Sequence, residues 1–321
     1  LSAIINTLMP STVVMIARSV NTAFMAAVID SLGWLDVLMV QQFVYGFPVA
    51  GIIPDSGVYR LLPHPLPVAS FQVRWASFVS SAPIWNRKLA RRLGARRWAD
   101  DLAVTADRAV AAKSDAEREK GAIVGPYYSP EALHDALAHQ FPGLPRSAVQ
   151  PRIMPRFGVK QKGSIRAIDD ARSSGTNDVA VMYETVTTPH FVFPAVVSRA
   201  FADAARSAGL PSPAMVVALC DLTMAYRTVP SAQPWYTCIG FSNPLLVPPR
   251  PQFYYLPGHN FGLASAVVNF NRFPELVVIA ARAFAAVAAE HYYDDFLLPD
   301  LAVGGNSSLE VVEDIILALG A

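Results

Sequence analysis

Two adjacent carboxylates, Asp294 and Asp295, are the residues whose types and spacing most clearly suit chemistry. They follow two tyrosines within an otherwise apolar stretch, residues 291–298 (HYYDDFLL). Since neighbouring side chains of a strand point to opposite faces, such a pair cannot be wholly buried without a charged partner, and we expect it in the tight turn of a β-hairpin. In a cleft, paired carboxylates suit a hard cation such as Mg²⁺. The alternative is a polar turn that binds nothing.

A third carboxylate, Asp221, follows a continuously apolar run, residues 214–220 (AMVVALC). Such a run predicts a short strand that is buried on both faces. Residues 222–227 then predict a helical turn, so Asp221 is either the N-cap of this turn or a functional group. On the functional interpretation, Asp221 meets the Asp294-Asp295 turn at one edge of a sheet, although Asp221 and Asp294 are 73 positions apart.

Residues 156–172 (RFGVKQKGSIRAIDDAR) predict two short strands joined by a turn at residues 162–164. Lys160, Lys162 and Arg166 occupy alternating positions, and we expect all three side chains on one side of the ribbon. A triphosphate or a nucleic-acid backbone would suit that side, because arginine can bind phosphate oxygens in bidentate fashion. Exposed hairpins also carry lysines without binding anything, which is the alternative interpretation.

A second concentration of positive charge lies in a region predicted to be helical, residues 84–120. Six cations occur within eleven residues, namely Arg87, Lys88, Arg91, Arg92, Arg96 and Arg97. Several of them are four residues apart and share a helix face, where like charges repel unless an anion compensates. A nucleic-acid backbone is one such anion. The alternative is a solvated face balanced by the acidic residues between positions 100 and 119.

Composition narrows the class of protein. The 321 residues carry a formal net charge of +1, so any nucleic-acid affinity must come from local basic patches. Hydrophobic residues make up 53%, yet Arg18, Asp30 and Asp36 interrupt the apolar N-terminal segments before any reaches the roughly 18–20 residues of a membrane span. We therefore expect a pair of buried helices there, with a loop at residues 46–48, and no membrane partner. Two cysteines exclude a disulfide framework and a zinc site and favour an intracellular location, cytoplasmic or nuclear.

The elements between these motifs are predicted more coarsely. Residues 51–67 are rich in proline and glycine and predict irregular chain. Ser129 followed by proline predicts the N-cap of a helix that ends near Gln140. Residues 194–208 and 275–289 predict further helices, the second of them buried, and residues 235–256 predict a hairpin.

In this order, the motifs resemble the polymerase domain of reverse transcriptases. The likeness is greatest to long-terminal-repeat and tyrosine-recombinase retrotransposons and to related sequences of protist genomes, and it covers about residues 121–300. Asp221, followed five residues later by an aromatic residue, resembles the first catalytic motif of the family, and residues 292–295 (YYDD) resemble its Tyr-x-Asp-Asp box. Arg166 matches the arginine of the hairpin that holds the incoming triphosphate, and residues 261–263 (FGL) resemble the template-gripping motif.

The resemblance implies RNA-directed DNA synthesis, in which two Mg²⁺ ions, or Mn²⁺, support nucleotidyl transfer from a dNTP to a primer 3′-hydroxyl. The implied catalytic residues and metal ligands are Asp221, Asp294 and Asp295. The residues implied to bind the dNTP are Lys160, Lys162, Arg166, Tyr226, Phe261 and Gly262, and the ring of Tyr226 would exclude a 2′-hydroxyl. Contacts with an RNA or DNA template-primer are expected from Arg87, Arg91, Arg97, Tyr292 and Tyr293.

The fold that the resemblance implies is an α+β polymerase palm, an antiparallel sheet with packed helices, joined to a fingers region. We expect an apolar region of helices and irregular chain over residues 1–85, a basic helix and the fingers over residues 86–210, and the palm over residues 211–321. The chain ends 26 residues after Asp295, so the thumb of the family is expected to be largely absent.

Two further departures from the family pattern bear on activity. In the family, Leu-Pro directly precedes Phe-Gly, whereas residues 258–260 (GHN) intervene here. Ser164 stands where the hairpin motif has a lysine. Together with the missing thumb, these departures support an alternative function, a degenerate and catalytically inactive retroelement remnant that binds RNA or DNA.

Overall fold

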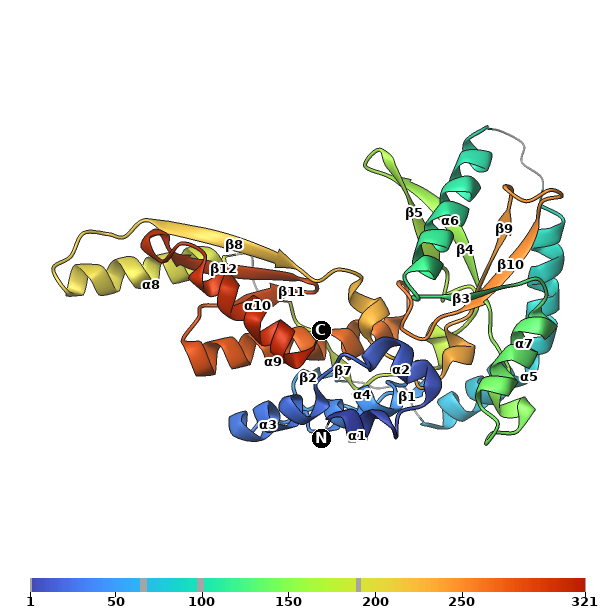
Figure 1. Cartoon of the computed structure of the whole chain (residues 1–321), viewed down its shortest axis with the longest axis horizontal. Coiled ribbons are helices and arrows are strands. Elements are labelled where there is room, and N and C mark those ends of the chain that lie inside the picture. The colour runs from blue at the N-terminus through green and yellow to red at the C-terminus, as the bar shows by residue number, and fades with distance from the viewer. Residues whose placement is uncertain (1, 64–67, 97–100, 189–191, 321) are drawn as a thin grey trace.

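The computed structural model describes residues 2–63, 68–96, 101–188 and 192–320, and it has the mixed α+β fold that the sequence predicts. The elements form two lobes (Figure 1). One lobe is built on a five-stranded sheet and the other on a three-stranded sheet, and the N-terminal helices lie beside the second. The candidate chemistry lies where the two lobes meet.

The strand order in the five-stranded sheet is β3-β10-β9-β4-β5. Its strands are β3 (Val124–Tyr127), β4 (Met154–Gln161), β5 (Ser164–Asp169), β9 (Ile239–Asn243) and β10 (Arg250–Tyr255). Neighbouring strands are antiparallel except β4 and β9, which pair in parallel. Strands β3, β4 and β5 precede the domain boundary expected at residue 210, whereas β9 and β10 follow it, and one sheet contains them all. The helices of this lobe are α5 (Val68–Gly94), α6 (Asp101–Glu119) and α7 (Pro130–Gln140). They pack around an apolar core that includes Ile153 and Phe253.

The three-stranded sheet is antiparallel, in the order β11 (Glu290–Tyr292), β12 (Asp295–Leu301) and β8 (Met215–Asp221). The helices of this lobe are α8 (Phe193–Ser207), α9 (Ala264–Ala285) and α10 (Ser307–Leu319). Phe296 and Leu298 of β12 point into a core shared with α9 and α10, whereas Leu219 of β8 is 68% exposed on the other face. The prediction that β8 is buried on both faces is therefore wrong, because β8 is an edge strand with one face open to solvent.

Four helices, rather than the predicted pair, occupy the described N-terminal region. They are α1 (Ser2–Asn6), α2 (Ser11–Ala17), α3 (Thr22–Leu32) and α4 (Leu38–Tyr45). The chain turns away from α4 at residues 46–48, as predicted. Arg272 of α9 forms a buried bidentate ion pair with Asp36, at 2.5 Å to each carboxylate oxygen, so this region packs as part of the second lobe.

No single helix of the described residues is long and apolar enough to cross a membrane. Helices α2 and α3 satisfy the length and composition requirement only when taken together, and they are bent by 70° relative to each other.

The remaining elements of the described chain are short. Strand β1 (Gly51–Ile52) pairs in parallel with β6 (Ala180–Val181), and β2 (Arg60–Leu61) pairs in antiparallel with β7 (Glu184–Thr185). Residues 51–63, expected to be irregular, contain two of these two-residue strands. The 3₁₀ helices of the described chain are η1 (Arg146–Val149), η2 (Asn177–Val179), η3 (Ala225–Thr228), η4 (Pro234–Tyr236) and η5 (Ala302–Gly304).

Most predicted helices are present, with shifted ends. The helical region expected at residues 84–120 corresponds to α5 and α6, and α5 begins earlier, at Val68. Helix α7 starts as predicted, because the Ser129 hydroxyl accepts a hydrogen bond from the Ala132 N–H at 3.0 Å. The helices expected at residues 194–208 and 275–289 correspond to α8 and α9.

The predicted hairpins are also present. Strands β9 and β10 pair over the region expected at residues 235–256. Strands β4 and β5 form the basic hairpin, with Lys162 and Gly163 as its two turn residues, both at positive φ. Two-residue turns of this kind match the right-handed twist of the strands that they join.

Candidate active site

Asp221 and Asp295 lie directly opposite each other at the paired ends of β8 and β12. Opposed residues of antiparallel strands point to the same face of a sheet, and both side chains are exposed here. The strand pairing continues one step further, since the Leu222 N–H donates to the Asp294 carbonyl oxygen at 2.9 Å. The structure therefore brings Asp221, Asp294 and Asp295 together at one end of the three-stranded sheet.

The electrostatics of these carboxylates favour a bound cation. Burial, and then the negative charges of Asp294 and Asp221, raise the pKa of Asp295. Within the described chain, no group of three or more His, Cys, Asp or Glu side chains is close enough to hold a metal ion as positioned. Because Asp221 and Asp295 are exposed, rotation about their side-chain bonds can bring their oxygens around one ion. Carboxylate oxygens are the donors that Mg²⁺ and Mn²⁺ prefer, so the donor set fits a divalent cation.

A buried histidine holds the turn that carries Asp294. Tyr293 has a φ of 57°, which is uncommon for a residue other than glycine. His291 Nδ1 lies 3.1 Å from the Tyr293 carbonyl oxygen, and His291 Nε2 lies 2.9 Å from Glu275 Oε2 of α9. Sequence reasoning did not identify His291 and Glu275 as positioning residues. The available signal was a histidine directly beside the carboxylate motif.

Tyr226 of η3 lies between the carboxylates and Phe261. The ring centroids of Tyr226 and Phe261 are 5.0 Å apart, and Tyr226 also packs against Phe270 of α9 at 5.2 Å. Burial, and then the negative charge of Asp294, raise the pKa of Tyr226 to about 12. The Tyr226 hydroxyl therefore stays protonated at neutral pH, close to the carboxylate end of the sheet.

The two tyrosines of the carboxylate motif differ in exposure. Tyr292 is opposite Asp295 in the β11–β12 pairing and is 51% exposed, so it projects from the same open face of the sheet. Tyr293 is partly buried in the turn, and its ring meets that of Tyr292 edge-on at 5.0 Å. Tyr292 is thus the member of the pair that a ligand on this face would meet first.

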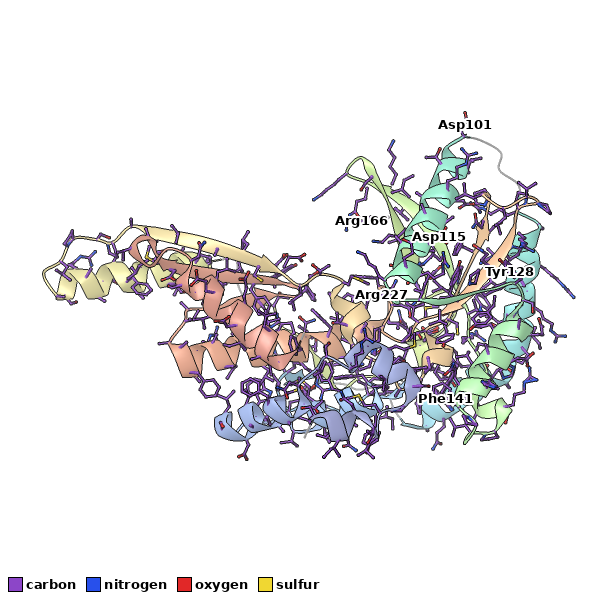
Figure 2. The ribbon with its side chains drawn as sticks, viewed as in Figure 1. Asp101, Asp115, Tyr128, Phe141, Arg166 and Arg227 are labelled. Atoms are coloured by element: carbon purple, nitrogen blue, oxygen red, sulfur yellow. The ribbon has the colours of Figure 1, made fainter. Side chains whose placement is uncertain are left out.

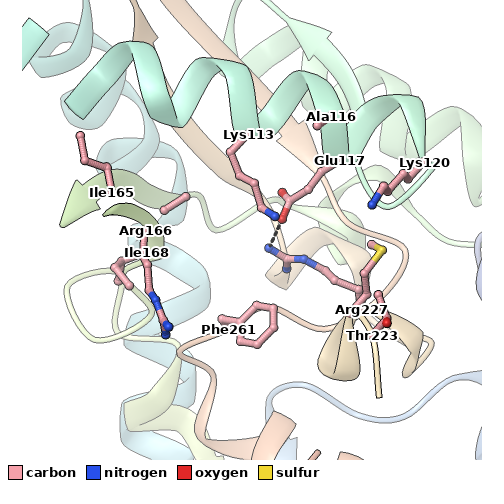
Figure 3. A pocket seen from close by; sticks show the side chains of 12 residues that line it. Lys113, Ala116, Glu117, Lys120, Ile165, Arg166, Ile168, Thr223, Arg227 and Phe261 are labelled. Carbon is pink, nitrogen blue, oxygen red and sulfur yellow. Dashed lines mark hydrogen bonds and ion pairs between the residues drawn. The ribbon is translucent and has the colours of Figure 1, made fainter. Parts of the chain in front are cut away.

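A hollow of about 510 Å³ lies between α6, β5 and the chain that follows Asp221 (Figure 3). Thr223 and Met224, which follow Asp221 closely in the chain, form part of its wall. Phe261 forms another part, and Arg166 extends from β5 towards it. The structure thus places two of the predicted nucleotide-binding residues, Arg166 and Phe261, around one cavity whose wall includes Thr223, two residues after Asp221.

The other two hairpin cations do not line this hollow. In the β4–β5 pairing, Arg166 is opposite Val159 and Lys160 is opposite Ile165. Opposed residues share a face and neighbours alternate, so Lys160 and Arg166 project to opposite sides of the ribbon. The prediction of one shared side is wrong, because the turn length sets the register between two strands. Lys162 lies in the turn itself.

Gly262 is required for close packing of the Phe261 loop against β5. Its φ is 106°, and a Cβ at this position would lie only 2.5 Å from the Asp169 carbonyl oxygen. Asn177 fixes the same loop, because its Nδ2 donates to the Gly262 carbonyl oxygen and its Oδ1 accepts from the Ala264 N–H, both at 2.9 Å. Sequence reasoning did not identify Asn177. Its polar side chain follows a turn, and nothing local distinguishes it.

Behind the hollow, two arginines and two carboxylates form a buried cluster. Arg156 of β4 donates to both oxygens of Asp169, at 2.6 and 3.2 Å, and to Glu117 of α6, at 2.7 Å. Arg227 of η3 donates to Asp169 at 3.1 Å and to Glu117 at 3.4 Å. Although burial opposes ionisation, Arg156 and Arg227 lower the pKa of Asp169 to about 2. The cluster joins α6, β4 and β5 to η3, which carries Arg227, the member of the cluster that is labelled in Figure 2.

Residues 258–260, which interrupt the expected motif, pack around Arg227. A Cβ at Gly258 would lie 2.2 Å from the Arg227 carbonyl oxygen. Burial lowers the pKa of His259 to about 4, and its Nδ1 lies 3.0 Å from the Val229 carbonyl oxygen. Asn260 donates to Asp169 at 3.1 Å. This segment therefore extends the buried cluster, and Phe261 still reaches the hollow.

Comparison of the sequence with protein-family models finds no matching family, and comparison with curated proteins finds no match.

The basic helix α5 lies away from the carboxylates. Arg87, Lys88, Arg91 and Arg92 are exposed on α5, at the outer side of the five-stranded sheet (Figure 1). None of these four has an ion-pair partner among the described residues, whereas Arg96 pairs with Asp107. Arg97, also predicted to contact nucleic acid, lies outside the described residues. The structure does not bring Arg87 or Arg91 next to Asp221.

Proposed function

We propose that this chain is the palm-and-fingers part of a reverse transcriptase, which adds dNTPs to a primer 3′-hydroxyl. The observation that carries the proposal is the opposition of Asp221 and Asp295 across β8 and β12, with Asp294 in the adjoining turn. On this proposal the three-stranded sheet is the palm, and the β4–β5 hairpin with α6 belongs to the fingers. The order of the sequence motifs supports the same assignment.

Asp221, Asp294 and Asp295 would hold two Mg²⁺ ions, or Mn²⁺. When bound, the ions lower the pKa of the primer hydroxyl and neutralise charge on the triphosphate and the leaving pyrophosphate. The side chains fix the place of reaction at the open end of the sheet. His291 keeps the turn in the conformation that presents Asp294, through its contacts with Tyr293 and Glu275.

Other side chains position the incoming nucleotide. Arg166 binds phosphate oxygens in the hollow, where the planar guanidinium can make paired hydrogen bonds. Phe261 lines the hollow and its ring contacts that of Tyr226, with ring centroids 5.0 Å apart. The sugar packs on the Tyr226 ring, which leaves no room for a 2′-hydroxyl and selects dNTP over NTP.

The open face of the three-stranded sheet receives the primer end of an RNA or DNA template-primer. Tyr292 and Leu219 are 51% and 68% exposed on this face, beside Asp295 and Asp221 respectively. Aromatic and apolar side chains of this kind pack against bases and sugars without reading the sequence. Binding on this face is therefore independent of sequence.

A second candidate function is nucleic-acid binding without chemistry, as in an inactive retroelement remnant. It is favoured by the hairpin, where Ser164 replaces a lysine and Lys160 projects away from Arg166. Of the hairpin cations, Arg166 is then the one that lines the hollow.

Single-nucleotide incorporation on a primed RNA template, with Mg²⁺ or Mn²⁺, tests the proposal and separates the two candidates. We expect Asp221→Asn and Asp294→Asn to lose at least 100-fold in rate, because each removes a charged ligand while keeping the side-chain shape. Asp30→Asn, at an exposed position of α3, is the matched control and should retain activity. If the unsubstituted chain incorporates no faster than Asp294→Asn yet binds the template-primer, the chemistry is absent and the remnant is correct.

A further inference from the structure

Two lysines that belong to none of the sequence motifs line the hollow. Lys113 is in the middle of α6, and Lys120 directly follows its last residue. The Lys120 N–H still donates to the Ala116 carbonyl oxygen at 3.2 Å, so helical geometry continues to this position. Residues seven apart are two helical turns apart and share a face. Both lysines consequently lie on the side of α6 that faces the hollow (Figure 3).

The hollow has more positive than negative charge. Glu117, on the same face of α6, is the carboxylate of its lining, and it is already bound by Arg156 at 2.7 Å and Arg227 at 3.4 Å. The buried cluster of two arginines and two carboxylates is neutral by itself. Lys113, Lys120 and Arg166 have no ion-pair partner among the described residues, so three cations around the hollow remain uncompensated.

The helix dipole accounts for only one of these three cations. A lysine at the C-terminus of a helix is favourable by itself, which accounts for Lys120 alone. Lys113 lies mid-helix and Arg166 lies on a strand, so neither gains from the helix dipole. Exposed cations that converge on one cavity raise its positive potential and attract a multiply charged anion. The volume of about 510 Å³ suits a small ligand rather than a polymer.

The residues that line the hollow indicate which kind of anion would bind there. Thr223 and Met224 form one wall and lie two and three residues after Asp221. Phe261 forms another wall and contacts Tyr226. A polyphosphate in the hollow would therefore have one end near the carboxylates and a nucleoside beside the aromatic pair.

We propose that Lys113 and Lys120 of the α6 face, together with Arg166, bind the triphosphate of the incoming nucleotide. The helix thereby supplies the cations that the hairpin lacks at Ser164. This assignment rests on the proposed polymerase function for the identity of the ligand. The binding of a polyphosphate anion by these three side chains does not depend on it.

Binding of inorganic triphosphate, measured by calorimetry in EDTA, tests the site without any chemistry. We expect Lys113→Gln with Lys120→Gln to weaken binding at least tenfold, and Arg108→Gln, at an exposed position of α6 that does not line the hollow, to leave it unchanged. Lys113→Arg with Lys120→Arg keeps the charge and should restore most of the affinity. Asp294→Asn should bind at least as tightly as the unsubstituted chain, because without metal the carboxylates repel the anion.

A second measurement separates this proposal from the proposed function. In single-nucleotide incorporation, the Lys113→Gln, Lys120→Gln variant should raise KM for dNTP at least tenfold with little change in kcat. An unchanged KM and an unchanged affinity for triphosphate would overturn the lysine assignment while leaving the polymerase intact. Lysine-dependent triphosphate binding in a chain that incorporates no nucleotide would support the anion site and overturn the proposed function.

Discussion

The carboxyl group of Asp295 titrates under the influence of its neighbours. Burial, and then the charges of Asp294 and Asp221, raise its pKa, since each nearby negative charge disfavours the ionised form. Asp221→Asn removes one of these charges and keeps the shape. We therefore expect the pKa of Asp295 to fall towards the ordinary aspartate value of about 3.9. NMR titration of ¹³C-labelled aspartate carboxyls in metal-free protein measures it.

The control for this titration is Asp30→Asn, which is exposed on α3 and should leave the pKa of Asp295 where it is. An unchanged pKa in Asp221→Asn would mean that the two carboxyl groups are not close in solution. The same titration sets the pH dependence of metal binding. An ion needs the ionised carboxylate, so its affinity should decrease as the pH falls through the raised pKa of Asp295.

At the scale of elements, the buried charge cluster decides whether the hairpin and the carboxylate end of the sheet keep their relative position. Arg156→Met leaves Asp169 and Glu117 with one buried arginine between them. Breaking a buried ion pair in this way typically costs about 3–5 kcal/mol, because an unpaired charge stays in the interior. We expect a loss of that size in the free energy of unfolding, measured by urea denaturation.

Arg206→Ala is the matched control, because Arg206 pairs with Asp203 on the exposed surface of α8 at 2.7 Å. Exposed pairs contribute about 0–1 kcal/mol, so this substitution should change the stability little. Equal effects of Arg156→Met and Arg206→Ala would contradict the assignment of the cluster as the connection between α6, β4, β5 and η3.

Local sequence patterns predicted individual helices, hairpins and turns well, but they predicted poorly how the strands pair and which of their faces are covered. The α7 N-cap, the β4–β5 hairpin and the meeting of Asp221 with the Asp294-Asp295 turn could be predicted because each depends on short-range residue types or on an ordered set of motifs. The opposite faces of Lys160 and Arg166 could not, because a two-residue turn sets the register. The open face of β8 could not either, because an apolar run does not reveal which neighbours cover the strand.

The lysines of α6 show the same limit for the candidate site. The sequence gives no reason to distinguish Lys113 and Lys120 from other exposed lysines of a helix. Only the packing of α6 beside β5 places them around the hollow. His291 and Glu275 are 16 positions apart in the sequence and meet only because α9 packs against β11. Residues that act through tertiary contacts carry no local signal, whereas the carboxylates carry one because their type and spacing are themselves unusual.

At the scale of the whole molecule, α9 connects the N-terminal helices to the candidate active site. Its Arg272 is buried against Asp36, and its Glu275, within one turn, meets His291 under the carboxylate turn. Phe270 of the same helix packs on Tyr226. The N-terminal region therefore supports the site through α9, a role that its apolar composition alone does not reveal.

The charge on α5 makes a prediction about nucleic-acid binding by the molecule as a whole. Replacing Arg87, Lys88, Arg91 and Arg92 by glutamine removes four exposed cations at the outer side of the five-stranded sheet. Each phosphate contact contributes about 0.7–0.9 to the slope of log affinity against log salt. We expect the variant to bind a primed duplex more weakly and with a slope smaller by about 3, as measured by fluorescence anisotropy between 50 and 200 mM salt.

The position of α5 makes this prediction specific. Because α5 lies away from the carboxylates, the rate of single-nucleotide incorporation at saturating template-primer should not change in the α5 variant. Arg199→Gln with Arg206→Gln removes two exposed cations from α8, where both lie near Asp203, and should leave the salt slope almost unaltered. Equal slopes for the α5 variant and the unsubstituted chain would show that the duplex does not reach α5, and the nucleic acid would then be bound only along the open face beside Tyr292.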